Sequence, residues 1–208
     1  RHIAEMVWCD GKLALVVTVC CFVCSGVCYD MPRVLLLTGR PGVGKTTLVQ
    51  RISQQLPADC CKSGFLTLEV REGAQRKGFR LLSLDGLESI IAHVDIPSRH
   101  QVGKYGVDVE AIGAACTALN IKDASGRSPD IFLVDEIGKM ECLSPKFVNS
   151  MRALLSQSDV PIIATIAQRA GGFVEEVKRM PAVTLWEVTP DNRDSLAASA
   201  LRWLRGPE

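Results

Sequence analysis

The segment from Gly39 to Thr46 reads Gly-Arg-Pro-Gly-Val-Gly-Lys-Thr, which is a complete Gly-x-x-x-x-Gly-Lys-Thr pattern. A triphosphate is a dense anion, and a loop that wraps around it must turn successive backbone N–H groups inward, which glycine permits. A helix that starts at the end of the loop adds unpaired N–H groups and the positive end of its dipole. The pattern therefore predicts a phosphate-binding loop; the alternative is a glycine-rich turn that matches by accident.

Each position of this loop has an expected role. Lys45 is expected to reach the β- and γ-phosphates as a point charge, and the Thr46 hydroxyl is expected to ligate Mg²⁺. Thr47 is placed to touch the α-phosphate. The residues predicted to bind the nucleotide are Gly39, Arg40, Pro41, Gly42, Val43, Gly44, Lys45, Thr46 and Thr47.

A second pattern, an apolar strand that ends in two carboxylates, runs from Pro129 to Glu136. Asp135 at the strand end is expected to hold the Mg²⁺ shell, directly or through water, because this hard cation prefers oxygen ligands and keeps several waters. Glu136 is expected to point elsewhere and to act as general base on the attacking water. The alternative is that the acid pair marks the start of a helix, where carboxylates are favoured.

The order of the predicted elements places these patterns in a fold. An apolar strand at 34–37 precedes the loop and a helix at 45–56 follows it; further strands and helices alternate to the last helix, which is expected from Asp191 after the capping signal Thr189-Pro190. Such alternation predicts a three-layer α/β fold with a mostly parallel central sheet flanked by helices. The ligand is then expected at the carboxyl ends of the strands.

Length and charge limit the other possibilities. The 208 residues suit one domain, and 47% of them are hydrophobic, which is enough to build a core. The formal net charge of +1 gives no electrostatic reason to expect a nucleic-acid or membrane surface.

Residues 1–30 differ from the rest, and we expect them to lie outside a catalytic domain at 31–208. The run from Leu13 to Cys28 is uncharged and is rich in cysteine. Three explanations are open: that Met31 is the natural start and the preceding segment an upstream extension, that the run is a targeting or membrane segment, or that it is an extra strand or helix packed on the domain.

The cysteines favour a reducing compartment. Cys21 and Cys24 have the Cys-x-x-Cys spacing, but the sequence has no second pair and its three histidines are scattered, so a zinc site is not expected. The remaining thiols suit a reduced protein, and we expect a cytoplasmic location, with an anchor at residues 13–28 as the exception.

Several strings together resemble one known family of the P-loop NTPase superfamily, the small nucleoside-triphosphatases. This family comprises the cancer-related nucleoside-triphosphatases and their relatives in thermophiles. The strings are Gly39 to Thr47, Gly64 to Arg71, Gly78-Phe79, Val102 to Asp108 and Val134 to Glu141. The resemblance implies a single RecA-like or kinase-like domain. It also implies Mg²⁺-dependent hydrolysis of ATP, GTP, CTP and UTP, with loose base selectivity.

The chain departs from the family at Leu66 and Leu68, where tyrosine and glutamate are common. These changes either alter water or substrate binding or are neutral packing at a strand edge.

Transition-state charge on the transferred phosphoryl group needs a cation beyond Lys45. We expect Arg71 in this role, and then Arg169 or Lys104; Arg76 and Lys77 lie on the same predicted hairpin as Arg71. The alternative for each is a solvated surface charge. After the acid pair, Lys139 and Glu141 are expected to pair with each other or to shape the site.

Two other functions use the same loop and metal site. A nucleotide or small-molecule kinase transfers the phosphoryl group to an acceptor hydroxyl, and a slow nucleotide-binding switch hardly turns over. The sequence contains no dense arginine lid of the kind a kinase needs. The patterns therefore favour a hydrolase.

Overall fold

The computed structural model describes residues 5–9, 12–16, 33–122, 126–157 and 159–206. In this part of the chain β1 (Glu5–Cys9) and β2 (Lys12–Val16) form a separate antiparallel pair, and the remaining strands form one nine-stranded sheet in the order β11-β3-β10-β9-β4-β5-β6-β8-β7. The uncharged run from Leu13 to Cys28 falls partly on β2 and otherwise outside the described residues. No described helix is long and apolar enough to cross a membrane.

The strands of the large sheet are β3 (Val34–Thr38), β4 (Lys62–Glu72), β5 (Gln75–Ser83), β6 (Glu88–His93), β7 (Gln101–Val102), β8 (Tyr105–Val107), β9 (Ile131–Ile137), β10 (Ile162–Ile166) and β11 (Val183–Glu187). The α-helices are α1 (Lys45–Gln55), α2 (Val109–Ala115), α3 (Pro145–Gln157), α4 (Gly172–Lys178) and α5 (Arg193–Arg205). Two short 3₁₀ turns, η1 (Cys116–Leu119) and η2 (Glu141–Leu143), complete the described elements.

The α/β prediction is confirmed, but the sheet is only partly parallel. The pairs from β11 through β3, β10 and β9 to β4 are parallel, whereas β5, β6, β8 and β7 are added antiparallel. Only two residues, Gly73 and Ala74, join β4 to β5, and a connection that short forces an antiparallel hairpin. The strand β6 was absent from the predicted elements.

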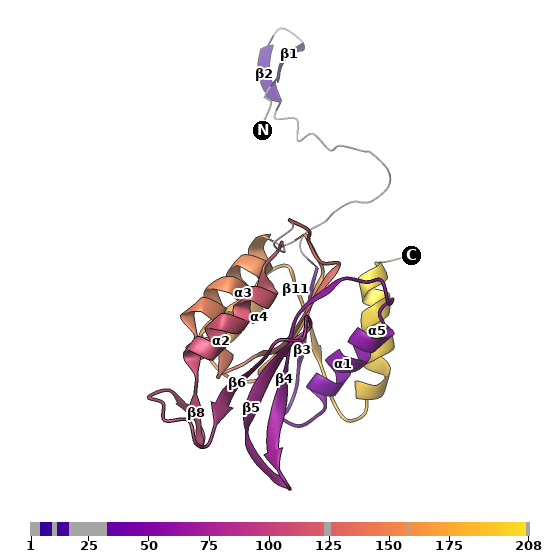
Figure 1. The fold of residues 1–208 in the computed structure, drawn as a ribbon. Helices are drawn as coiled ribbons and strands as arrows, with labels where there is room; N and C mark the ends of the chain where they lie inside the picture. Colours follow the sequence, from indigo (N-terminus) through magenta and orange to yellow (C-terminus); the bar gives the residue numbers. More distant parts are fainter. Residues whose placement is uncertain (1–4, 10–11, 17–32, 123–125, 158, 207–208) are drawn as a thin grey trace.

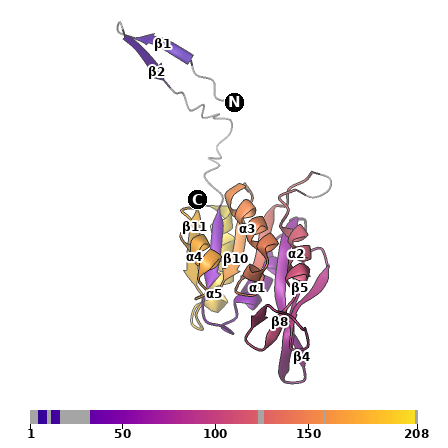
Figure 2. The same ribbon diagram turned by 90° about the vertical axis from the view of Figure 1, so that its left-hand side faces the viewer.

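Helices cover both faces of the sheet, as Figures 1 and 2 show. On β3, Val34 and Leu36 pack in the core beneath α2, α3 and α4, while Leu35 and Leu37 pack in the core beneath α1 and α5. Successive side chains of a strand point to opposite faces, so a strand buried on both faces must be apolar throughout. This explains the run of four apolar residues before the loop.

The last helix begins two residues later than predicted. The Asn192 carboxamide accepts a hydrogen bond from the Thr189 backbone N–H at 2.8 Å and donates one to the Glu187 carbonyl at 2.9 Å. These bonds hold residues 187–192 as a loop, so α5 starts at Arg193. Arg193 therefore lies on the first turn of α5.

The close contact between β4 and β9 predicts that replacing Gly64 by alanine strongly lowers the free energy of unfolding. Its φ is +112°, and a Cβ atom there would lie 2.0 Å from the Leu133 carbonyl oxygen, whereas one at Gly86 (φ +94°) would meet nothing within 4 Å. Gly86→Ala should therefore cost only the backbone strain, about 1–2 kcal/mol, and Gly64→Ala should cost about 1–3 kcal/mol more through overpacking. Urea unfolding of both variants measures the difference; equal losses would contradict the described close approach.

Candidate active site

The carboxyl ends of β3, β10, β9 and β4 meet at one edge of the sheet, around a cavity of about 550 Å³ that we call the main cavity. It is lined by both sequence patterns and by the β4–β5 hairpin: Pro41, Gly42, Gly44, Lys45, Thr46, Thr47, Thr67, Leu68, Glu69, Arg76, Phe79, Val102, Asp135, Glu136, Gly138, Lys139, Met140, Glu141 and Ala167. The fold thus brings the predicted phosphate-binding loop and the predicted acid pair together.

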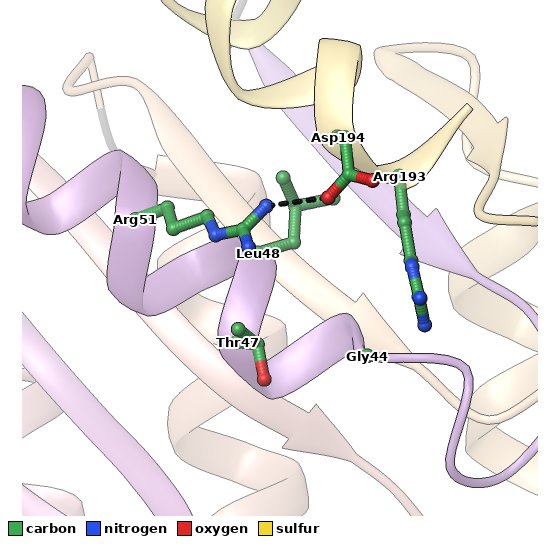
Figure 3. Close-up of a pocket in the computed structure, with 6 residues that line it drawn as sticks. All are labelled: Gly44, Thr47, Leu48, Arg51, Arg193 and Asp194. Atoms are coloured by element: carbon green, nitrogen blue, oxygen red, sulfur yellow. Dashed lines mark hydrogen bonds and ion pairs between the residues drawn. The ribbon is translucent and has the colours of Figure 1, made fainter. Parts of the chain in front are cut away.

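Glycine is required at both ends of the loop. A Cβ atom at Gly39 would lie 2.5 Å from the Val188 carbonyl oxygen, and Gly44 caps α1 with a φ of +105°. The helix begins at Lys45, so its first N–H groups, which have no intrahelical acceptor, lie beside the main cavity. Figure 3 shows Gly44 where the loop meets α1, and Thr47 on the first turn of α1.

Lys45 supplies a positive charge inside the loop. Its side chain is 8% exposed, and its Nζ donates a hydrogen bond to the Gly39 carbonyl oxygen at 3.2 Å. An ammonium group has three donors, so this bond leaves others for an anion in the main cavity.

The Asp135 carboxylate is buried between β9 and β10. Its Oδ1 accepts a hydrogen bond from the Thr165 hydroxyl at 2.6 Å, whereas Oδ2 is buried with no hydrogen-bond partner among the described residues. Burial raises the pKa of Asp135, and the hydroxyls of Thr165 and Thr46 oppose this shift in part. A buried oxygen without a donor, on a carboxylate that Thr46 faces, suits a cation.

The donor set also fits Mg²⁺ rather than a metal held in a protein cage. Within the described ranges, no three histidine, cysteine or acidic residues cluster to hold a metal. Mg²⁺ is commonly bound by one or two protein oxygens, by waters and by the phosphates of a substrate. Thr46 and Asp135 supply oxygens of this kind.

The pairing of β9 with β10 is irregular at the acid pair. The pairing with β10 shifts after Ala164, which lies opposite Val134, so that Ile166 lies opposite Ile137 and Thr165 alone faces Asp135 and Glu136. In a regular strand successive side chains point to opposite faces, whereas a bulge re-aims them. Asp135 and Glu136 both line the main cavity, and of the two only Glu136 also lines a second cavity, described below.

Glu136 is half-buried and lines a second, adjoining cavity together with Gly39, Lys45 and Arg169. Burial raises the pKa of the Glu136 carboxyl, Lys45 lowers it, and Asp135 raises it further. Within the described chain no group donates a hydrogen bond to this carboxylate. Its oxygens are therefore available to a water molecule.

Of the two expectations for Lys139 and Glu141, the mutual pair is not formed, and both residues line the main cavity. Lys139 is exposed, whereas Glu141 is only 4% exposed and makes no ion pair with a described residue. Burial raises the pKa of Glu141 to about 8, with Glu136 and Asp135 adding to the shift and the Gly138 N–H opposing it. At neutral pH Glu141 is therefore a mainly neutral acid in the wall of the main cavity.

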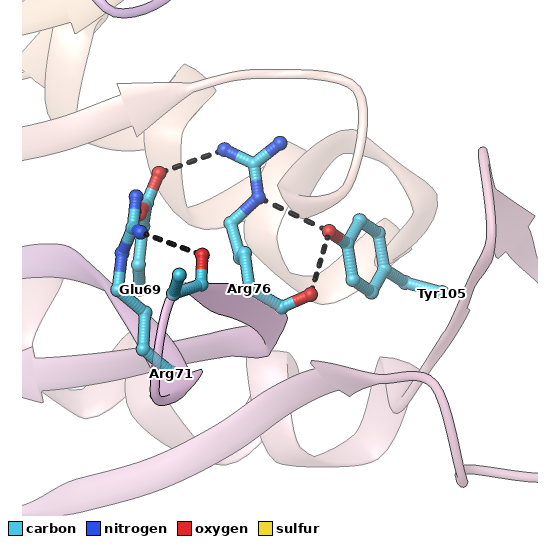
Figure 4. Close-up of polar contacts among 5 residues, drawn as sticks. Glu69, Arg71, Arg76 and Tyr105 are labelled. Atoms are coloured by element: carbon cyan, nitrogen blue, oxygen red, sulfur yellow. Dashed lines mark hydrogen bonds and ion pairs between the residues drawn. The ribbon is translucent and has the colours of Figure 1, made fainter.

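Of the arginines on the β4–β5 hairpin, Arg76 lines the main cavity and Arg71 does not, while Arg169 lines the adjoining cavity with Lys45 and Glu136. Arg71 is 54% exposed, is bound to Glu69 at 2.5 Å, and does not line the main cavity. Arg76 lines it and is held in place by Glu69 (2.7 Å) and by the Tyr105 hydroxyl (3.0 Å), as Figure 4 shows. Lys104 lies 5.5 Å from the centre of the Tyr105 ring and does not line this cavity either.

The hairpin geometry explains this difference. The register of β4 and β5 shifts after Val70, which lies opposite Gly78, so that Arg71 lies opposite Arg76. Arg71 is two residues beyond Glu69 toward the hairpin tip, whereas the Arg76 guanidinium lies over the Phe79 ring, 5.0 Å from its centre. No signal in the sequence indicates such a shift.

Leu66 and Leu68, the two positions at which the chain departs from the family pattern, have different surroundings. Leu66 is 8% exposed and belongs to the core beneath α1 and α5. Leu68 packs partly against that core and also lines the main cavity. Leu66 is therefore a packing residue, and Leu68 is the one of the two that a ligand in the cavity would touch.

Comparisons with known proteins agree with these observations. A model of the family described as NTPase matches residues 34–201. The nucleoside-triphosphatase THEP1 of Thermotoga maritima is 42% identical over 178 residues, which cover 83% of this chain and 97% of the relative.

Two solved structures are similar along most of their length. The crystal structure of THEP1 from Aquifex aeolicus has a TM-score of 0.72 at 35% identity and covers 82% of this chain and 98% of its own. The solution structure of a human cancer-related nucleoside triphosphatase has a TM-score of 0.73 at 33% identity and covers 85% and 99%.

The buried acid predicts a pH-dependent stability. The pKa of Glu141 is raised from about 4.5 to about 8 on folding. The contribution of Glu141 to the free energy of unfolding is therefore fully present below about pH 4.5 and is lost as the pH rises toward 8. Glu141→Gln removes that loss: its free energy of unfolding relative to the wild type should rise between pH 5.5 and pH 8, by at most about 1.4 kcal/mol per pH unit. Urea unfolding in EDTA measures this; a pH-independent difference would contradict the raised pKa.

Proposed function

The chain belongs to the nucleoside-triphosphatase family, and we propose that it hydrolyses nucleoside 5′-triphosphates to the diphosphate and phosphate, with ATP, GTP, CTP and UTP as substrates. The observation that carries the proposal is that Lys45, Asp135 and Glu136 line one cavity at the carboxyl edge of the sheet. A phosphate-binding loop alone would support only binding. The half-buried Glu136 beside it supports hydrolysis.

In this proposal the loop from Gly39 to Thr47 holds the phosphates. The N–H groups at the start of α1 face the oxygens, and Lys45 binds the β- and γ-phosphates with the donors that its bond to the Gly39 carbonyl leaves free. Thr47, at the end of the loop, contacts the α-phosphate. The γ-phosphate then lies toward Glu136.

The proposed cofactor is Mg²⁺, with Thr46 and Asp135 as its protein ligands. The buried Asp135 Oδ2 without a donor supports this assignment. When bound, the ion would neutralise charge on the phosphate oxygens.

Glu136 is the proposed general base. Its carboxylate accepts a proton from a water molecule as the water oxygen bonds to the γ-phosphorus, and the bond from that phosphorus to the β-phosphate oxygen breaks. The diphosphate leaves with the electron pair of that bond. The absence of a competing donor to Glu136 among the described residues supports this role.

The test of this function is phosphate release from ATP and Mg²⁺ in the absence of any acceptor. We expect steady release of inorganic phosphate. Release that strictly requires an added hydroxyl compound would show a kinase instead, and binding with almost no turnover would show a nucleotide switch.

Replacing the proposed base separates turnover from binding. Glu136→Gln keeps the shape of the side chain but cannot accept the proton, so turnover should fall about 100-fold or more while the Kd for ADP changes little. Phosphate release and calorimetric binding measure the two effects. Near-normal turnover in this variant would remove Glu136 from the role of base.

The arginine assignment is tested by a matched pair on one hairpin. We propose Arg76, rather than the sequence-based choice Arg71, as the cation that faces the transferred phosphoryl group, because Arg76 lines the main cavity. Arg76→Ala should reduce kcat about 1000-fold, whereas Arg71→Ala should reduce it less than about threefold. The reverse order of effects would restore Arg71 to this role.

A further inference from the structure

A smaller cavity of about 250 Å³, which we call the α1–α5 cavity, lies between the first turns of two helices (Figure 3). It is lined by Gly44, Thr47, Leu48 and Arg51 from the start of α1 and by Arg193 and Asp194 from the start of α5. Gly44 and Thr47 line the main cavity as well. The two cavities therefore adjoin each other at the end of the phosphate-binding loop.

The polar groups of this cavity are arranged in two sets. Arg51 and Asp194 form an ion pair at 2.7 Å across the two helices. Arg193 donates one hydrogen bond to the Val43 carbonyl oxygen at 3.3 Å, and its side chain passes over Gly44, where its Cδ would lie 3.7 Å from an added Cβ. An arginine has five donors, so most of this guanidinium is uncommitted to the described residues.

The direction of the substrate in the proposed function selects this cavity for the nucleoside. With the γ-phosphate toward Glu136 and the α-phosphate at Thr47, the ribose and base must leave the main cavity beside Thr47. Another cavity, of about 440 Å³, touches Arg40 to Val43 and Glu187 to Pro190, but it reaches neither Lys45 nor Thr47. It therefore adjoins the start of the loop and not its end.

We propose that the α1–α5 cavity is the nucleoside subsite and that Arg193 stacks its guanidinium on the face of the base. This inference rests on the proposed function and names the part of the site that holds the base. A planar guanidinium stacks well on aromatic faces, and every base has such a face. Arg51 and Asp194 are paired with each other. Stacking by Arg193 uses the face of the base and not its polar edge, so it gives affinity with little dependence on the identity of the base.

The experiment compares ligands with and without a nucleoside. The Kd values of ADP, GDP and UDP and that of inorganic pyrophosphate are measured with Mg²⁺ for the wild-type full chain, Arg193→Ala, Arg193→Lys and the control Arg202→Ala. Arg202 lies on the same helix α5, is exposed and donates to Ser199. None of these ligands contains a γ-phosphate, so hydrolysis does not interfere.

We expect Arg193→Ala to weaken ADP, GDP and UDP binding by a similar factor of about ten or more, with pyrophosphate binding unchanged. Arg193→Lys should also weaken the three nucleotides, since it keeps the charge but loses the planar group, and Arg202→Ala should change nothing. An equal loss for pyrophosphate would overturn the proposal, because Arg193 would then act through Val43 and the loop. Unchanged nucleotide binding, or a loss confined to one base, would also overturn it.

The same data distinguish a failure of the subsite from a failure of the function. If the wild-type chain binds neither pyrophosphate nor the nucleotides, the phosphate-binding role of the loop is wrong. If it binds all of them and Arg193→Ala leaves the nucleotides unaffected, only the subsite is wrong.

Discussion

The buried carboxylate of Asp135 is the constraint on which the site depends. Its Oδ1 is bound by Thr165 from the neighbouring strand, and its Oδ2 has no donor among the described residues. Burial of a carboxylate with an unsatisfied oxygen costs free energy unless a cation or proton compensates. The register of β9 and β10 shifts at this point, and the neighbouring Glu136 lines the main cavity as well. The parallel strands β3, β10 and β9 end at one edge of the sheet, which places both acids beside the phosphate-binding loop.

The sequence predicted those parts of the fold that local chemistry determines. The glycines of the loop, the apolar strands around it and the alternation of strands and helices predicted the α/β class, and the structure confirms it. The sheet is only partly parallel and not mostly parallel: β4 and β5 form the predicted hairpin, and β6, β8 and β7 are then added antiparallel at that edge. Long-range register of this kind is set by the whole sheet and not by the residues of one strand.

In the site too, features set by local sequence patterns were predicted, whereas features set by burial and strand register were not. Lys45, Thr46 and Asp135 lie in one cavity, as the spacing of the patterns predicted. Two other features depend on burial and on the register shift in the hairpin: the separation of Glu141 from Lys139, and the position of Arg76 rather than Arg71 at the main cavity. Neither of these is visible in residue types or spacing.

In the proposed reaction, a water molecule activated beside Glu136 attacks the γ-phosphorus of a nucleoside triphosphate. The most direct test is hydrolysis of ATP with Mg²⁺ in ¹⁸O-labelled water, followed by mass spectrometry of both products. We expect one ¹⁸O atom in the released inorganic phosphate and none in ADP. Label in ADP, or no labelled phosphate in the absence of an acceptor, would contradict it.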